Sequence, residues 1–146
     1  MDADTVPQSD GSYLRIWRND LFIEDMDEFM ELYMHHIVQI LTHEPIDIFA
    51  RPTYLPINFA RHYDQLWTKK RMRIIIELAS ARDIALEIQE NTRIPSLTFI
   101  QQAKEAGIKF TFGTNARNHN AGNFHYCLEM AEKCNLTEAD MFMIEV

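Results

Sequence analysis

The stretch IALEIQENTRIPSLTFIQQAKEAGIKFTF, residues 84–112, decides the fold class. Two short apolar runs, 84–88 and 108–112, flank a segment whose apolar residues recur at helical spacing. Pro95 followed by Ser96 is typical of a helix start, and Gly107 is typical of a left-handed helix end. A strand, a helix and a strand in this order predict two parallel strands joined by a crossover helix.

The same alternation extends in both directions. Upstream, an apolar run at 46–50 precedes an irregular connection, and Thr68 can cap a helix. Downstream, a polar loop leads to a helix with an apolar face made of Phe124, Cys127, Leu128 and Ala131. Three strand–helix units predict an α/β domain with right-handed crossovers and helices on both sheet faces.

The N-terminal region divides into three parts. Residues 1–11 are polar and unpatterned, which predicts a disordered tail that packs against nothing, so the domain is expected to span 12–146. Residues 13–18 alternate like a half-exposed edge strand, and 25–42 form an amphipathic helix. At the other end, the apolar segment 141–146 has to dock on the domain.

The charge, the apolar stretches and the cysteines of the sequence limit the classes of protein to which this chain can belong. The 146 residues include 22 acidic and 14 basic side chains, so the net charge of −8 argues against general nucleic-acid binding. No apolar stretch is long enough to span a bilayer, and the first ten residues lack the features of an export signal, so we expect a cytoplasmic protein. Cys127 and Cys134 are expected to be buried thiols in a reducing compartment.

Polar residues follow each predicted strand. Arg51 comes after the first strand, Gln89 after the second, and Asn115 and Arg117 after the third. Ligand sites in parallel α/β folds lie beyond the carboxyl ends of the strands. We therefore expect any chemistry at this edge.

Three segments at these strand ends resemble the polymerase and histidinol phosphatase (PHP) family. In IDIFARP, 46–52, Arg51 stands directly before proline, where the family has a ligand histidine. Residues 85–95, ALEIQENTRIP, are similar to the family's next strand and loop. In GIKFTFGTNAR, 107–117, Asn115 and Arg117 replace a ligand aspartate and histidine.

The resemblance implies part of a TIM-like, distorted (β/α)7 barrel that hydrolyses phosphoesters with a divalent metal such as Zn or Mn. The family's opening His-x-His motif has no counterpart, so the N-terminal half of the barrel is expected to be missing. An open edge would then be covered by residues 13–18, by a second copy of the chain, or by a complementary barrel half. The aromatic residues Tyr54, Phe59 and Trp67 are a candidate partner surface.

Arginine cannot replace a metal ligand, because its guanidinium is always charged and has no lone pair to donate. One hypothesis is that Arg51 and Arg117, with Arg93, Gln89 and Asn115, bind a small phosphorylated or carboxylate ligand.

A competing interpretation is that these arginines pair with Asp47, Glu87 or Glu90 and fill the vacated cavity. A shifted metal site at His119 and His125 lacks a second pair of ligands. The expected function is thus a truncated PHP-type hydrolase with reduced or lost catalysis, and the alternative is a non-catalytic anion-binding or assembly module.

Overall fold

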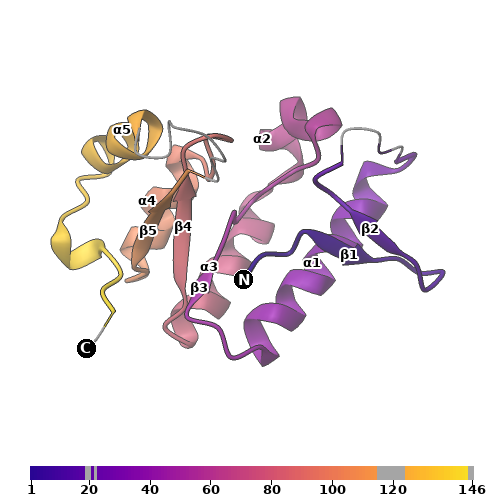
Figure 1. Ribbon diagram of the computed structural model, residues 1–146, viewed down its shortest axis with the longest axis horizontal. Coiled ribbons are helices and arrows are strands. Elements are labelled where there is room, and N and C mark those ends of the chain that lie inside the picture. The colour runs from indigo at the N-terminus through magenta and orange to yellow at the C-terminus, as the bar shows by residue number, and fades with distance from the viewer. Residues whose placement is uncertain (19–20, 22, 115–123, 145–146) are drawn as a thin grey trace.

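The computed structural model describes residues 1–18, 21, 23–114 and 124–144. The fold is mixed α/β, with a small antiparallel hairpin and a separate three-stranded parallel sheet (Figure 1). In chain order the strands are β1 (Thr5–Pro7), β2 (Tyr13–Arg15), β3 (Ile48–Phe49), β4 (Ala85–Gln89) and β5 (Phe110–Gly113). The helices are α1 (Met26–His43), η1 (Ile57–His62), α2 (Tyr63–Leu66), α3 (Lys69–Ala81), α4 (Leu97–Glu105), α5 (His125–Lys133) and η2 (Glu138–Asp140).

The helix starts follow the predicted capping chemistry. The Asp25 carboxylate accepts hydrogen bonds from the first backbone N–H groups of α1. Thr68 and Ser96 cap α3 and α4 in the same way. Gly107 follows α4 with a φ of +83°, which confirms the expected left-handed helix end.

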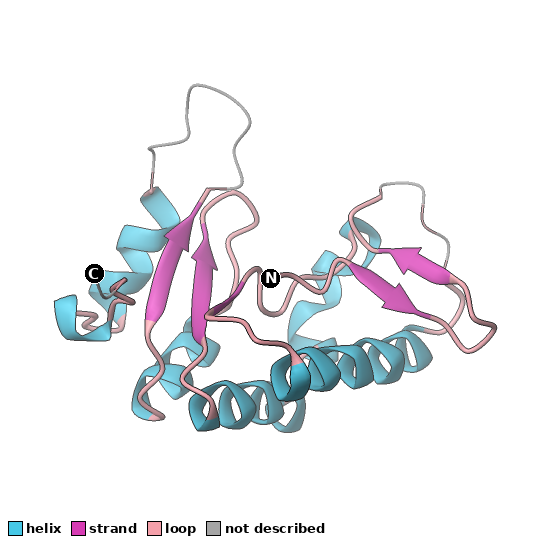
Figure 2. Cartoon of the chain, turned by 60° about the horizontal axis from the view of Figure 1, so that its bottom comes forward, coloured by secondary structure: helices cyan, strands magenta, loops and turns pink. Residues whose placement is uncertain are grey.

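The parallel sheet has the strand order β3-β4-β5, and both pairs are parallel, as residues 84–112 predict. The two crossover helices, α3 and α4, lie on the same face of this sheet and do not cover both faces between them (Figures 1 and 2). Strands in sequential order, joined by crossovers of one hand, place consecutive helices on one side. Leu86 and Ile88 of β4 join the hydrophobic core, whereas Glu87 alternates to the opposite face.

The expected disordered tail is also wrong. β1 pairs with β2 in an antiparallel hairpin, and the side chains of Ala3 and Val6 are buried. Residues 13–15 therefore pair with this N-terminal segment and not with the edge of the parallel sheet. Helix α1 packs against β1, so the apolar face of α1 buries the hairpin.

Both edges of the parallel sheet are partly covered by other segments of the chain. The Met1 nitrogen donates to the Ile48 carbonyl at 2.8 Å, and the Met1 carbonyl accepts from the Ala50 N–H at 2.5 Å. These two bonds have the pattern of a parallel ladder. At the other edge Met141 forms a parallel bridge with Phe110, so the predicted docking of the C-terminal segment is confirmed for this residue.

Two details differ from the sequence-based expectations. The connection expected to be irregular contains η1 and α2. Leu128 was expected on the inner face of its helix but is 62% exposed.

Cys127 and Cys134 are buried free thiols, as expected. Within the part of the chain that the structure describes, no helix combines the length and the apolar character needed to cross a lipid bilayer.

Candidate functional site

The carboxyl ends of the three parallel strands meet at one edge of the sheet. Gln89, the last residue of β4, lies in register with Gly113, the last residue of β5. The chain continues from β3 into Arg51 at the same edge. The edge that the sequence predicted as the site is therefore formed, and its side chains decide what it can bind.

Arg51 is engaged within the protein. Its Nε donates to Asp2 Oδ2 at 2.5 Å, its guanidinium carbon lies 4.6 Å from the centroid of the Tyr54 ring, and its side chain is only 12% exposed. Burial raises the pKa of Asp2, while the hydrogen bond from Arg51 acts in the opposite direction. The ion-pair partner is Asp2, and not Asp47, Glu87 or Glu90 as the sequence interpretation expected.

Glu87 lies between Arg51 and β5. Its Oε1 accepts a hydrogen bond from the backbone N–H of Arg51 at 3.0 Å. A Cβ atom added at Gly113 would meet the other carboxylate oxygen of Glu87, so a larger residue at position 113 would require this side chain to shift. Burial raises the pKa of Glu87, and the Arg51 N–H partly offsets that effect.

The two polar residues after β4 hold the surrounding loops. The Gln89 side-chain oxygen accepts a hydrogen bond from the Thr92 hydroxyl, and Gln89 is buried. The Glu90 carboxylate accepts from the backbone N–H groups of Tyr126 at 2.8 Å and Cys127 at 3.2 Å, which lie in the first turn of α5. A negative charge in this place stabilises the helix N-terminus.

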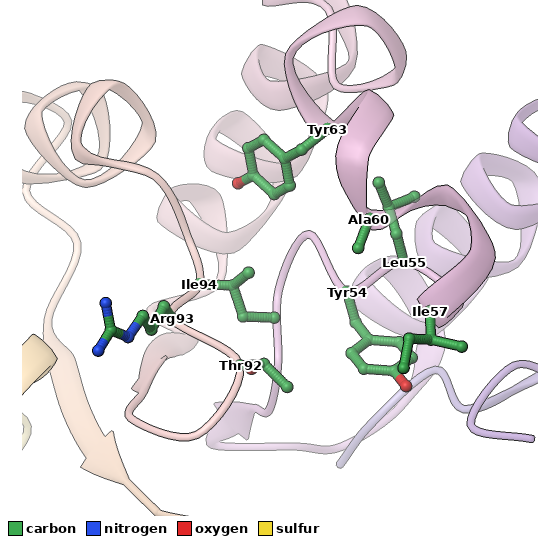
Figure 3. Close-up of a pocket in the computed structure, with 8 residues that line it drawn as sticks. All are labelled: Tyr54, Leu55, Ile57, Ala60, Tyr63, Thr92, Arg93 and Ile94. Atoms are coloured by element: carbon green, nitrogen blue, oxygen red, sulfur yellow. The ribbon is translucent and has the colours of Figure 1, made fainter. Parts of the chain in front are cut away.

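A cleft of about 390 Å³ lies beside these loops. We call it the Tyr54–Tyr63 cleft, and Figure 3 shows the residues that line it: Tyr54, Leu55, Ile57, Ala60, Tyr63, Thr92, Arg93 and Ile94. They come from the segment after β3, from η1 and α2, and from the loop between β4 and α4. Its volume falls in the range of roughly 300–1,000 Å³ that is typical of small-molecule sites.

A hydrogen-bond network joins the walls of the cleft. The Tyr63 hydroxyl donates to Thr53 Oγ1 at 2.6 Å and accepts from the Ser96 N–H at 3.0 Å. Thr53 is fully buried and has a φ of +69°, which is unusual for a β-branched residue. The three wall segments are therefore connected through one tyrosine.

The predicted anion-binding residues are only partly brought together. Arg93 lines the cleft, but its guanidinium points away from the other lining side chains (Figure 3). It approaches α5, where Lys133, and to a smaller extent Arg93, lowers the pKa of Glu129. Asn115 and Arg117 lie outside the described residues, as does His119.

Within residues 1–18, 21, 23–114 and 124–144, no group of three or more His, Cys, Asp or Glu side chains is arranged to hold a metal ion. The sequence interpretation missed Asp2, because its partner Arg51 is 49 positions away and residues 1–11 carry no structural pattern. Of the aromatic residues expected to form a partner surface, Tyr54 is a wall of the cleft, whereas Phe59 and Trp67 are buried in the core.

Comparison of the chain with protein-family models, with curated proteins and with solved structures finds no match.

Proposed function

We propose that this chain is a non-catalytic binding module built on the scaffold of a PHP-type metal-dependent phosphoesterase. The scaffold is supported by three motifs in the family's order, at 46–52, 85–95 and 107–117. It is also supported by the sequential parallel strands with their crossover helices on one face, which is how strands and helices are arranged in a (β/α) barrel.

The main support for a loss of catalysis is the ion pair between Arg51 and Asp2. Arg51 stands where the resemblance places a ligand histidine, and a guanidinium offers a metal no lone pair. A divalent cation at this point would meet a fixed positive charge that is already paired with the nearest carboxylate. The Glu87 carboxylate is engaged as well, because its Oε1 accepts a hydrogen bond from the backbone N–H of Arg51.

A binding role is supported by the position of the Tyr54–Tyr63 cleft. It lies beyond the carboxyl ends of β3 and β4, where α/β folds place their ligands. Its walls are joined by hydrogen bonds before any ligand arrives, as is usual for small-molecule sites.

Metal content and phosphatase turnover test this proposal together. The purified protein is analysed for bound metal, and hydrolysis of para-nitrophenyl phosphate is followed with added Mn²⁺ or Zn²⁺. We expect no stoichiometric metal and no turnover above buffer.

Two variants make the result specific. Asn115→Ala removes the remaining neutral oxygen at a family ligand position, and Asn58→Ala is the control at an exposed asparagine in η1. Stoichiometric metal, with turnover that Asn115→Ala abolishes and Asn58→Ala preserves, would show that the chain is a metal-dependent hydrolase.

A further inference from the structure

We propose that the Tyr54–Tyr63 cleft binds a small, uncharged molecule that carries an aromatic ring. The inference rests on the proposed binding function and gives it a ligand class. It follows from the chemistry of the walls, from the direction of the nearby charges, and from the way the walls are fixed.

The walls are mostly apolar. Two tyrosine rings, three aliphatic side chains and an alanine account for six of the eight lining residues. Leu55 and Ile94 are almost fully buried and form an apolar part of the lining. An aromatic ring fits between such walls because it buries a large apolar surface and makes tilted or edge contacts with tyrosine rings.

The nearby charges do not face the cleft. Arg93 is the one charged residue among the eight that line it, and its guanidinium points away from the others (Figure 3). The Arg51 guanidinium stacks on the Tyr54 ring, but it is bonded to Asp2 and is not part of the lining. An anionic group inside the cleft would lose water without gaining a cation in return.

The cleft is fixed before binding. The Tyr63 hydroxyl links Thr53 to the Ser96 N–H and so holds two loops against α2. Thr53 and Arg93, in those two loops, both have a positive φ, at +69° and +54°. Non-glycine residues in this strained region gather at ligand sites, because the surrounding structure must hold them there. A fixed site loses little conformational freedom on binding.

Ile57 supplies the surface that a ligand would cover. It lines the cleft and is 63% exposed, so much of its apolar surface is in contact with solvent. A one- or two-ring molecule that entered between Tyr54 and Tyr63 would remove part of this surface from water, which favours binding.

Matched pairs of probes test the ligand class. Phenol is compared with phenyl phosphate, and indole with indole-3-carboxylate, so that each pair differs by one anionic group. Binding is measured from the amide chemical shifts of Leu55, Ile57 and Ile94 during titration into the millimolar range. We expect saturable shifts with the neutral member of each pair, and about tenfold weaker binding of the anionic member, because its charge would be buried without a partner.

Two variants locate the site. Ile57→Asp should weaken the binding of indole about tenfold, because a carboxylate replaces apolar contact surface. Leu128→Asp is the matched control, since Leu128 is equally exposed at 62% but does not line the cleft. Ala60→Trp fills the cleft from η1 and should abolish the shifts, and its urea midpoint shows whether it remains folded.

Three results would overturn the inference. They are the absence of saturable shifts with all four probes, tighter binding of an anionic member than of its neutral counterpart, and equal weakening by Ile57→Asp and Leu128→Asp. None of these results alters the metal content or the phosphatase turnover. The experiments therefore distinguish an error in the proposed ligand class from an error in the proposed non-catalytic function.

Discussion

Removing one oxygen atom at Tyr63 should loosen the whole cleft. Tyr63→Phe keeps the ring but removes the hydroxyl that donates to Thr53 Oγ1 and accepts from the Ser96 N–H. The segment after β3, the start of α2 and the start of α4 meet at this hydroxyl. Its loss therefore affects the position of the loops as well as the stability of the fold.

The expected magnitude follows from the two lost bonds. A hydrogen bond contributes about 0.5–1.5 kcal/mol net, and a buried group left without a partner costs about 1–3 kcal/mol. The Thr53 hydroxyl belongs to a fully buried residue, so it falls in the second class. We expect Tyr63→Phe to lower the free energy of unfolding by about 2–4 kcal/mol, which lowers Tm by roughly 6–12 °C for a chain of this size.

Urea unfolding of four variants measures this effect. Tyr13→Phe is the matched control, because Tyr13 is 69% exposed, and it should change the free energy of unfolding by less than about 0.5 kcal/mol. Thr53→Val removes the partner hydroxyl but keeps the β-branched shape. The double variant Tyr63→Phe/Thr53→Val completes a cycle whose coupling energy should exceed about 0.5 kcal/mol. A loss below about 0.5 kcal/mol in Tyr63→Phe, with no coupling to Thr53, would refute the role of this network.

Three further predictions concern the strand ends and α5. The raised pKa of Glu87 means that its contribution to stability is fully present below its ordinary pKa of 4.5 and is lost as pH rises through the folded-state pKa. Glu87→Gln should therefore remove part of the decline in unfolding free energy above pH 4.5, as measured by urea titrations at several pH values. Glu90→Ala should destabilise the protein by about 1–2 kcal/mol and increase hydrogen exchange at the Tyr126 and Cys127 amides, whereas unchanged exchange there would contradict its capping role. Burial raises the pKa of Cys127 to about 12, so a thiol reagent at neutral pH should modify it only as fast as the protein unfolds, and rapid modification of the folded protein would contradict its burial.

Local patterns in the sequence predicted the parallel sheet. Alternating strand and helix signals, with caps at Thr68 and Ser96 and a glycine at the end of α4, are set by neighbouring residues and by standard helix chemistry. The placement of α3 and α4 on the same face was not predicted. It depends on the order of the strands in space, which short-range patterns do not contain.

The candidate site was predicted only as an edge of the sheet. The resemblance directed attention to Arg51, but its partner Asp2 lies in a segment whose composition is typical of disorder. The cleft was missed because its walls come from three separate segments, and one of them, η1, was expected to be irregular. The bond from Tyr63 to Ser96 joins residues 33 positions apart, and residue spacing alone does not predict such a contact.

The covered edges of the parallel sheet have a consequence for aggregation. A strand with unpaired N–H and C=O groups can recruit a strand from another molecule. Here Met1 occupies part of the β3 edge, and Met141 with Phe142 occupies part of the β5 edge. Each cover is only one or two residues long, so local detachment costs far less than global unfolding. The first self-association of this protein should therefore start from an otherwise native molecule in which one of these short segments has come away from the sheet.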